Sequence, residues 1–281
     1  TGTALHEPVE PRQVMREVPP RQQPTKPALP SFNVDLGIKG RTAAVAAGTA
    51  GLGFASAKAL ADAGVRVVIC GRSKDRLDAA VVKLGNGAVG VECDVSTADG
   101  ASMFVDLARE RLGHIDILVA NGGGPKPGNF AALKTEDYLP ALQQSLLSVV
   151  AMCEATVGSM RERKWGRIVA ITSISVRQPI PSLILSNTAR AGVTGFLKTL
   201  AREVAGDGVT VNSVQPGIHA TDRVTQLYGA SPNAAQLGIP AGFVGDPSDF
   251  GNVVAFLCSE PARFITGAHV PVDGGSYAGL L

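Results

Sequence analysis

The chain has 281 residues, of which 45% are hydrophobic, so it is long enough to bury one sizeable core. Charged residues make up 18% and the formal net charge is +2, which excludes the basic footprint of a nucleic-acid-binding protein. The 33 glycines follow no three-residue period, which excludes a collagen-like repeat, and the hydrophobic content excludes wholesale disorder.

Residues 1–35 differ in composition from the rest of the chain. Prolines recur through this segment among Arg, Gln, Glu and Lys, at Pro8, Pro11, Pro19, Pro20, Pro24, Pro27 and Pro30. Because proline restricts φ and lacks an N–H donor, neither a helix nor a strand ladder can propagate here. We therefore predict an extended N-terminal arm, which is either a leader without fixed structure or a segment that lies across a neighbouring subunit.

From Gly40 onward, short apolar runs alternate with amphipathic segments. The pattern predicts strands over 42–47, 65–70, 88–93, 115–120, 167–172, 209–214 and 268–272. It predicts helices over 54–63, 75–84, 98–112, 136–163, 184–205 and 248–258. Apolar strands that are each followed by a helix require a parallel sheet covered on both faces, with ligands at the carboxyl ends of the strands. The prediction for 36–281 is one doubly wound α/β domain of the Rossmann type.

A glycine-rich turn follows the first predicted strand. In such a turn the backbone approaches a pyrophosphate, which the next helix N-terminus stabilises. The candidate cofactor residues in this turn are Gly48, Thr49, Gly51, Leu52 and Gly53. After the second strand, Arg72 stands near the place where an NAD site carries an acidic residue. Since an arginine binds a 2′-phosphate, the sequence favours NADP(H).

Several motifs together resemble those of the classical short-chain dehydrogenase/reductase family, from about residue 36 to residue 281. Segment 46–53 resembles the TGxxxGxG turn of that family, although Ala47 replaces its first glycine, and segment 273–275 resembles its terminal signature. Ala120 replaces the first residue of its NNAG motif. The resemblance implies further cofactor contacts from Asp94, Val95, Asn121, Gly122, Pro216, Gly217 and Thr221.

The resemblance also implies a catalytic tetrad of Asn, Ser, Tyr and Lys, from which this chain departs. Ser173 matches the serine, while Ser186 stands at the tyrosine position and Arg190 at the lysine position. Segment 190–193 resembles the KAGV of the family and supports this register, and Ser145 falls at the asparagine position. The tetrad is therefore expected to be Ser145, Ser173, Ser186 and Arg190.

These replacements change the proton chemistry. A phenol with a pKa of about 10 can give and take a proton, whereas the alkyl hydroxyl of Ser186 is a far weaker acid. Arg190 can hold ribose hydroxyls but stays charged, and Ser173 can polarise a carbonyl. The proton could come from water, from the substrate, or from His219 on the loop after the Pro-Gly turn. Tyr228, in a predicted substrate lid over 222–245, is a further candidate.

The leading prediction is an NADP-dependent oxidoreductase that reduces a carbonyl with a non-standard proton source. Two alternatives remain open: a non-redox enzyme of this fold, such as a cyclase, isomerase or dehydratase, and a catalytically silent cofactor-binding subunit. Arg177, Gln178, Asp222 and Arg223 are expected to flank the cleft. Surplus apolar residues on the predicted helices 136–163 and 184–205 favour a homodimer or homotetramer, as the resemblance also implies.

The remaining features predict a cytoplasmic protein that has no metal site and no membrane-spanning segment. The four cysteines (Cys70, Cys93, Cys153 and Cys258) are scattered without metal-binding spacing, which predicts buried free thiols and a reducing compartment. No apolar run is long enough to span a bilayer, and residues 1–10 do not have the pattern of a signal peptide.

Overall fold

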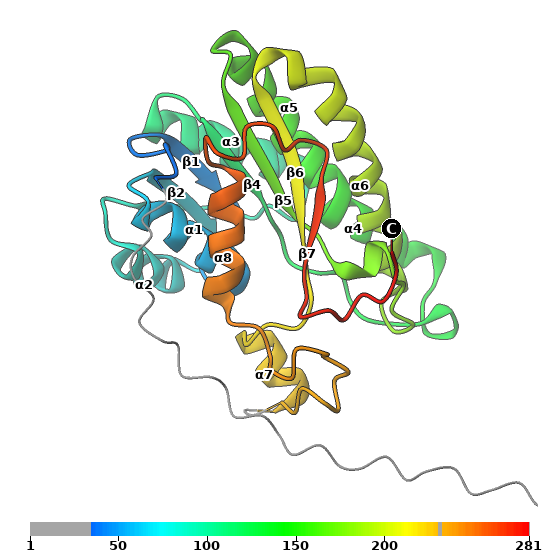
Figure 1. The fold of residues 1–281 in the computed structure, drawn as a ribbon. Helices are drawn as coiled ribbons and strands as arrows, with labels where there is room; N and C mark the ends of the chain where they lie inside the picture. The colour runs from blue at the N-terminus through cyan, green and yellow to red at the C-terminus, as the bar shows by residue number, and fades with distance from the viewer. Residues whose placement is uncertain (1–34, 230–231, 281) are drawn as a thin grey trace, which may run out of the picture.

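A single parallel sheet organises the computed structural model, which describes residues 35–229 and 232–280 (Figure 1). The predicted N-terminal arm therefore lies, apart from its last residue, outside the described part of the chain. The strands are β1 (Thr42–Val45), β2 (Arg66–Gly71), β3 (Val89–Glu92), β4 (Ile117–Ala120), β5 (Gly166–Ile171), β6 (Val209–Pro216) and β7 (His269–Val272). Their order is β3-β2-β1-β4-β5-β6-β7, which confirms the predicted doubly wound fold. The order reverses between β1 and β4.

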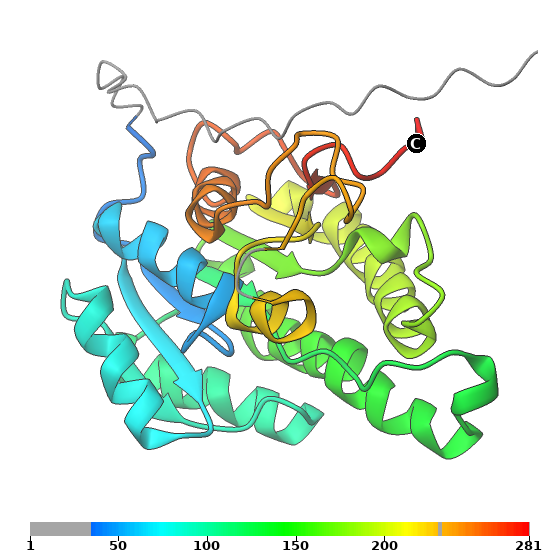
Figure 2. The same cartoon turned by 90° about the horizontal axis from the view of Figure 1, so that it is seen from below.

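Helices cover both faces of the sheet, as Figures 1 and 2 show. One face carries α1 (Gly51–Asp62), α2 (Lys74–Leu84) and α8 (Pro247–Leu257), and its core includes Leu60, Leu77 and Phe250. The other face carries α3 (Ala98–Leu112), α5 (Ser148–Glu162) and α6 (Ile184–Val204), with Phe104 and Leu197 in its core. Because both faces are covered, the central strands are apolar throughout and show no alternation in the sequence.

Small residues allow two helices on one face to pack closely. Gly251 of α8 lies against the backbone of Ala55 in α1, where a side chain on residue 251 would have no room. Buried α1 residues include Gly53, Ala57 and Ala61, so the abundance of Gly and Ala in the composition corresponds to close helix packing.

The predicted helix over 136–163 is interrupted in the structure. A short helix α4 (Tyr138–Leu142) continues into a π-helical turn, η3 (Gln143–Leu147), and then into α5. A π-turn inserts one residue into the helix, and apolar spacing alone does not indicate such an insertion. Short 3₁₀ turns occur at η1 (Phe130–Ala132), η2 (Thr135–Asp137), η4 (Ile174–Val176) and η5 (Ala205–Asp207), and one further helix, α7 (Asp222–Tyr228), follows β6.

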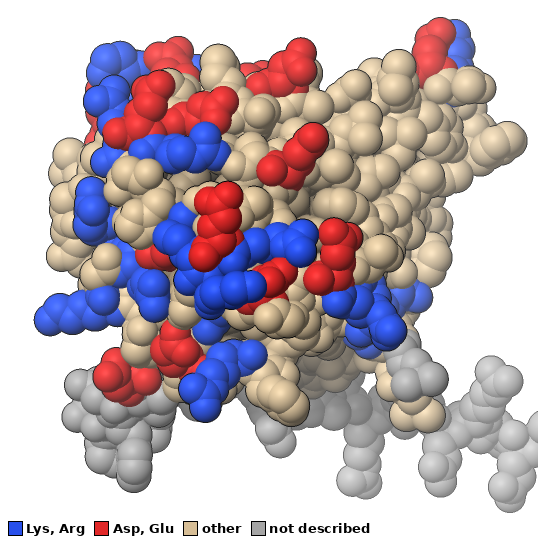
Figure 3. Space-filling view, turned by 90° about the horizontal axis from the view of Figure 1, so that it is seen from above, with Lys and Arg blue, Asp and Glu red and all other residues tan. Residues whose placement is uncertain are grey.

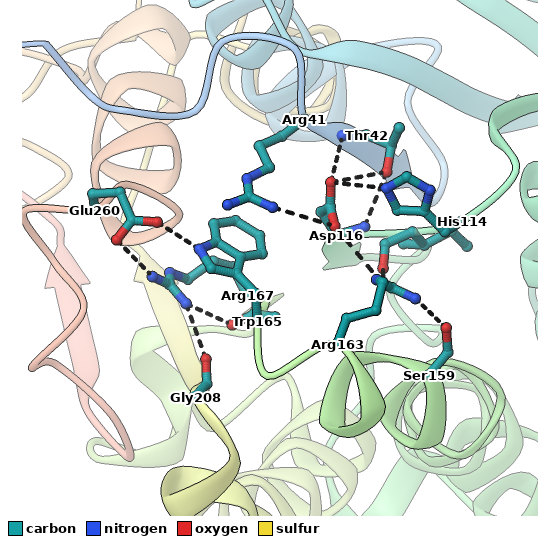
Figure 4. A network of polar contacts seen from close by, with 12 residues as sticks. Arg41, Thr42, His114, Asp116, Ser159, Arg163, Trp165, Arg167, Gly208 and Glu260 are labelled. Atoms are coloured by element: carbon teal, nitrogen blue, oxygen red, sulfur yellow. Dashed lines mark hydrogen bonds and ion pairs between the residues drawn. The ribbon is translucent and has the colours of Figure 1, made fainter.

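A buried carboxylate organises the edge of the sheet where the strands begin (Figure 4). Asp116 is 2% exposed and accepts a hydrogen bond of 3.2 Å from the backbone N–H of Thr42. Its carboxylate lies 3.8 Å from Arg41, 3.8 Å from Arg163 and 3.3 Å from His114. The carboxylate thereby connects the first residues of β1 to the end of α5.

Two arginines enclose Trp165 beside this carboxylate. The guanidinium of Arg41 lies 3.8 Å from the centre of the indole ring, and that of Arg167 lies 4.3 Å from it. Arg167 is buried, donates to the carbonyl of Gly166 at 2.9 Å, and pairs with Glu260 at 3.6 Å. Lys, Arg, Asp and Glu side chains are intermixed over this end of the molecule (Figure 3).

The described cysteines are free and buried, as the sequence predicts. Burial raises the pKa of Cys70, Cys153 and Cys258 to about 12, so these thiols stay protonated. Over residues 35–229 and 232–280, no group of three or more His, Cys, Asp or Glu side chains could hold a metal ion. No helix in that part of the chain is long and apolar enough to cross a membrane.

Candidate active site

The glycine-rich turn between β1 and α1 leaves no room for larger residues at two positions. A Cβ atom on residue 53 would lie 2.5 Å from the carbonyl oxygen of Ala47 and 2.6 Å from the side-chain nitrogen of Asn121. A Cβ atom on residue 48 would lie 2.7 Å from the side chain of Ile69. The side-chain amide of Asn121 donates to the carbonyl oxygen of Ala46 at 3.2 Å, so this residue supports the turn from β4.

The N-terminus of α1 is suited to an anion. Its N-cap residue is Ala50, whose side chain cannot accept a hydrogen bond from the first turn, and residues 51–54 include no acidic side chain. The first backbone N–H groups of a helix lack intrahelical partners and carry the positive end of the helix dipole. A dinucleotide pyrophosphate fits this position, because it supplies the missing acceptors and the opposite charge.

A cavity of about 190 Å³ opens beside the turn, at the carboxyl ends of β2 and β3. It is lined by Thr49, Arg72, Asp94 and Val95 among the predicted cofactor residues. Arg72 is exposed and lies 3.9 Å from the carboxylate of Asp94. The cavity therefore brings the two sequence-predicted nucleotide contacts, one from β2 and one from β3, to the same place.

Arg76 lines the same cavity and was not among the predicted residues. It lies in the first turn of α2, and both arginines line this opening. A second basic residue shortly after Arg72 is visible in the sequence, and it could have indicated a second group for a phosphate. Gln144, from the π-turn, and Gly123 complete the cavity on the side of β4.

A groove runs along the carboxyl edge of the sheet, with the glycine-rich turn on one side and the residues after β6 on the other. Gly217 packs so closely that a Cβ there would lie 2.7 Å from Asp273, and its backbone N–H donates to Val272 at 3.0 Å. The methyl group of Thr221 lies 3.6 Å from the position of a Cβ on Gly51. Thr221, which follows the turn after β6, therefore lies beside Gly51, the first residue of α1.

The four predicted catalytic residues lie on α6, or within or beside two elements that pack against it, η3 and η4. Ser173 follows β5 and accepts a hydrogen bond of 3.1 Å from the backbone N–H of Ser175. Ser186 and Arg190 lie one turn apart on α6, and Arg190 donates to the carbonyl oxygen of Ile171 at 2.9 Å. Ser145 belongs to the π-turn and is 4% exposed.

Chemically, this group offers hydroxyls and a permanent cation. Arg190 is held against the last residue of β5, which directs its charge toward the carboxyl edge of the sheet. Ser186 is 8% exposed and keeps a short hydroxyl at the same end of α6. The arrangement can orient a carbonyl oxygen and bind ribose hydroxyls, but neither a serine nor an arginine is an acid near neutral pH.

His219, one of the proton donors that the sequence suggested, lies in a packed position behind the turn after β6. The residue is 4% exposed, and its ring meets Phe250 edge-on with the ring centres 5.3 Å apart. Its Nδ1 atom lies 3.3 Å from the carbonyl oxygen of Gly217, and a Cβ on Gly245 would lie 2.7 Å from the ring. Burial lowers the pKa of His219, so the neutral form is favoured in a packed position.

The segment predicted as a lid, residues 222–245, begins with α7 and lies below the carboxyl edge of the sheet (Figure 1). Its two ends meet where the backbone N–H of Gly245 donates to Ile218 at 3.0 Å and that of Ala220 donates to Gly245 at 2.8 Å. The side chains of Arg223 and Tyr228 lie outside the described part of the structure. A second cavity, of about 330 Å³, lies between this segment, α1 and α8, and Gly51 and Thr221 are among its lining residues.

The loop after β5 contacts the C-terminal segment through Arg177 and Gln178, which the sequence analysis had placed at the edge of the cleft. The guanidinium of Arg177 lies 5.4 Å from the ring centre of Tyr277 and donates to the carbonyl of His269 at 2.8 Å. The backbone N–H of Ala278 donates to the side chain of Gln178 at 3.5 Å. These contacts connect the loop that carries Ser173 to residues 277–278.

The sequence and the fold were compared with those of known proteins. Residues 46–277 match the family model described as enoyl-(acyl carrier protein) reductase. The 3-oxoacyl-[acyl-carrier-protein] reductase FabG of Haemophilus influenzae is 34% identical over 85% of this chain and 99% of its own length. The structure of L-sorbose reductase from Gluconobacter frateurii, complexed with NADPH and L-sorbose, has a TM-score of 0.81 and 29% identity over 88% of this chain and all of that chain.

A third similarity concerns a protein with an unusual site. The NADPH-bound structure of a short chain oxidoreductase from Pseudomonas aeruginosa PAO1, described as containing an atypical catalytic center, has a TM-score of 0.79. It is 30% identical and covers 85% of this chain and 97% of that chain. The family model, the curated relatives and the solved structures agree over the whole α/β domain. This chain therefore belongs to the short-chain dehydrogenase/reductase family of oxidoreductases.

Proposed function

We propose that this protein is an NADP(H)-dependent reductase of a carbonyl compound whose proton does not come from a tyrosine. The observation that carries the proposal is the groove at the carboxyl edge. It combines an open helix N-terminus, a turn that admits only glycine at residues 48 and 53, and a cavity with Arg72 and Arg76. The NADPH complexes among the structural relatives support the same cofactor.

In this proposal each wall of the groove holds one part of the cofactor. The α1 N-terminus binds the pyrophosphate, Arg72 and Arg76 bind the 2′-phosphate, and Asp94 with Val95 contacts the adenine. Asn121, Gly122 and the 216–217 turn with Thr221 border the nicotinamide. When bound, NADPH supplies a hydride.

The residues of this chain then hold the carbonyl and the ribose. Ser173 and Ser186 orient the substrate oxygen, and Arg190 binds the hydroxyls of the nicotinamide ribose. We assign Ser186 and Arg190 to the positions where the family has Tyr and Lys, and Ser145 to the Asn position. Because His219 is enclosed, the proton is assigned to water or to an acidic group of the substrate.

The relatives indicate which carbonyl compounds should be examined first. Several curated relatives are 3-oxoacyl-[acyl-carrier-protein] reductases, and one structural relative holds L-sorbose. The 3-oxoacyl group and L-sorbose are both ketones that carry another carbonyl or a hydroxyl group close to the ketone carbon. We therefore propose a ketone with a neighbouring carbonyl or hydroxyl group, with 3-oxoacyl thioesters as the first class to test.

A single-turnover experiment tests the proposal. Protein loaded with NADPH should lose absorbance at the reduced nicotinamide band when mixed with acetoacetyl thioesters, ketoses or simple ketones. The Arg72→Ala, Arg76→Ala double variant should bind NADPH at least tenfold more weakly and bind NADH with unchanged affinity, because only NADPH carries the 2′-phosphate. Tight NADPH binding without hydride transfer to any member of the panel would contradict the proposed activity.

A non-redox activity is the second candidate, since Ser186, Arg190 and Ala47 all differ from the family pattern. Failure to bind NADPH in a fluorescence titration would favour a cyclase, isomerase or dehydratase. A silent cofactor-binding subunit would bind NADPH and co-purify with an active relative. Reductase activity of the isolated protein excludes both.

We also propose that the protein assembles as a homodimer or homotetramer through its central helices. Leu139 of α4 is 64% exposed and Leu147 of the π-turn is 36% exposed, and both contribute to an apolar outer face. Light scattering of the purified chain would measure the assembly. A second measurement, on a variant that lacks residues 1–34, would show whether the predicted N-terminal arm changes the mass of the assembly.

A further inference from the structure

Buried polar atoms without partners gather around one end of α6. Among the described residues, buried side-chain atoms without a hydrogen-bond partner belong to Gln143, Ser145, Ser175, Thr210 and Gln215. All of these except Thr210 lie on η3, on η4 or at the end of β6, and each of these elements packs against α6. Native proteins satisfy nearly all buried polar groups, so such a concentration at one place requires an explanation.

Gln215 is the most pronounced of these cases. It is 0% exposed, and both its side-chain oxygen and its side-chain nitrogen lack a partner. A carboxamide offers two donors and an acceptor, and burying it unpaired destabilises the fold. An apolar residue of the same size would pack there without this penalty.

The strand register places this amide beneath the candidate catalytic residues. Val211 of β6 lies in the core with Val193 and Leu197 of α6. Because side chains alternate along a strand, Gln215 faces the same layer as Val211. The guanidinium of Arg190 meets the sheet at Ile171, which pairs with Val214, and Gln215 is the next residue of β6.

A water molecule is the partner that fits such a position. Buried waters occur where two to four polar groups converge, and they satisfy groups that the protein itself leaves unpaired. The carboxamide of Gln215 is one such group, and Ser186 belongs to the buried face of α6, together with Val193 and Leu197, which packs on this layer. Ser175, on η4, provides another unpaired hydroxyl toward the loop after β5.

We propose that Gln215 anchors an ordered water between β6 and α6, and that this water supplies the proton that reaches the substrate through Ser186. The proposal rests on the proposed carbonyl reduction and identifies its proton route. In this reaction, a C–H bond forms with the hydride as the C=O π bond breaks. In one concerted relay the substrate oxygen takes the proton of Ser186 while Ser186 takes one from the water, so no free alkoxide forms, and the water is reprotonated from solvent. One solvent proton is consumed for each hydride, and the nicotinamide is oxidised. Gln215 is thus a positioning residue that acts through the water.

The test compares Gln215→Met with a matched control on the same strand, Thr210→Val. Thr210 also has a buried, unpartnered hydroxyl, but it lies at the other end of β6 and on the opposite face. Gln215→Met should unfold at the same or a higher temperature than the wild type, because it removes an unpaired amide. Its kcat should fall at least tenfold, while the KM and the NADPH affinity change less than twofold. Thr210→Val should keep the wild-type kcat.

A high-resolution crystal structure of the full chain with NADPH gives a readout that does not depend on activity. The expected result is a water within hydrogen-bond distance of the Gln215 amide in the wild type and its loss in Gln215→Met. An unchanged kcat in Gln215→Met, or no water at Gln215, would overturn the proposal even if the protein reduces ketones. If the water is present but the wild type transfers no hydride, the proposed function fails and the proton route fails with it.

Discussion

At the scale of single residues, the glycine-rich turn contains one strained position. Ala47 adopts a φ of 47°, in the left-handed region that glycine enters without steric penalty. The family turn has glycine at this place, and the alanine is accommodated here at a conformational cost. A Cβ atom on residue 53 would lie 2.5 Å from the carbonyl oxygen of Ala47. The turn is therefore strained by the alanine at residue 47 and would be strained further by a side chain at residue 53.

Ala47→Gly should therefore raise the free energy of unfolding by about 0.5 kcal/mol. Relief of left-handed strain contributes roughly 1 kcal/mol and the extra entropy of glycine in the unfolded chain removes about half of it. Gly53→Ala should lower the free energy of unfolding by about 2 kcal/mol, because its Cβ would lie 2.5 Å from a carbonyl oxygen. Urea denaturation of both variants measures these changes. Equal effects of the two substitutions would contradict the steric account of the turn.

At the scale of elements, the amino edge of the sheet is held by one buried carboxylate and partly exposed cations around it. Asp116 joins β1, β4 and the end of α5 through Thr42, Arg41 and Arg163 (Figure 4). The Asp116 carboxylate is buried while Arg41 and Arg163 are partly exposed, so neutralising it weakens hydrogen bonds inside the fold, which is more damaging than neutralising one member of an exposed pair.

Asp116→Asn should lower the free energy of unfolding by about 2 kcal/mol, because the hydrogen bonds that the buried carboxylate accepts lose their charge, while Arg41 and Arg163 stay partly exposed to solvent. The matched control is Asp78→Asn, which removes an exposed carboxylate that pairs with Lys74 at 2.6 Å. Its unfolding midpoint should equal that of the wild type. Thermal unfolding followed by circular dichroism compares the two variants, and a similar loss in both would show that burial at residue 116 is unimportant.

At the scale of the whole molecule, one buried histidine, His219, and one half-buried histidine, His269, make stability depend on pH. Burial lowers the pKa of His219 and of His269 below the value of 6.5 that applies in the unfolded chain. Between these values the unfolded state binds more protons than the native state, so stability falls as the pH falls through this window. Above the unfolded pKa neither state is protonated, and the contribution is constant.

We therefore expect the free energy of unfolding to decrease between pH 7.5 and pH 5.5, by no more than about 1.4 kcal/mol per pH unit for each histidine. His219→Gln should reduce this slope, because glutamine does not titrate. Urea midpoints measured across the range at constant ionic strength provide the comparison. A slope equal to that of the wild type would contradict the assignment to His219.

Most of the fold was predictable from local patterns in the sequence. The apolar runs located every strand to within two residues at each end, and α3 (Ala98–Leu112) has the bounds that its periodicity predicts. The π-turn at η3 was not predicted, because one inserted residue leaves the apolar spacing of a long helix almost unchanged. Helix α7 was not predicted either, because its seven residues are too few to establish a period.

The candidate site was predictable only in part, for physical reasons that differ between residues. The proximity of Arg72 to Asp94, and of Thr221 to the glycine-rich turn, was predictable because a parallel sheet brings the residues after its strands together at one edge. The burial of His219 against Phe250 was not predictable, because it depends on how α8 packs. Gln215 was missed as a functional candidate, because an unpaired amide becomes visible only when its surroundings are known.

The sequence by itself determined the parallel α/β sheet, the glycine-rich turn and the presence of serine and arginine at positions 186 and 190. These follow from short-range order: the period of apolar residues, the backbone freedom of glycine and the chemical identity of side chains. Tertiary structure alone decided which polar groups are buried, paired or left without partners. Burial and hydrogen bonding depend on contacts between segments far apart in the chain, such as β6 with α6 and Asp116 with Arg41. For this reason the cofactor groove could be predicted from motifs, whereas the enclosed His219 and the unpaired Gln215 could not.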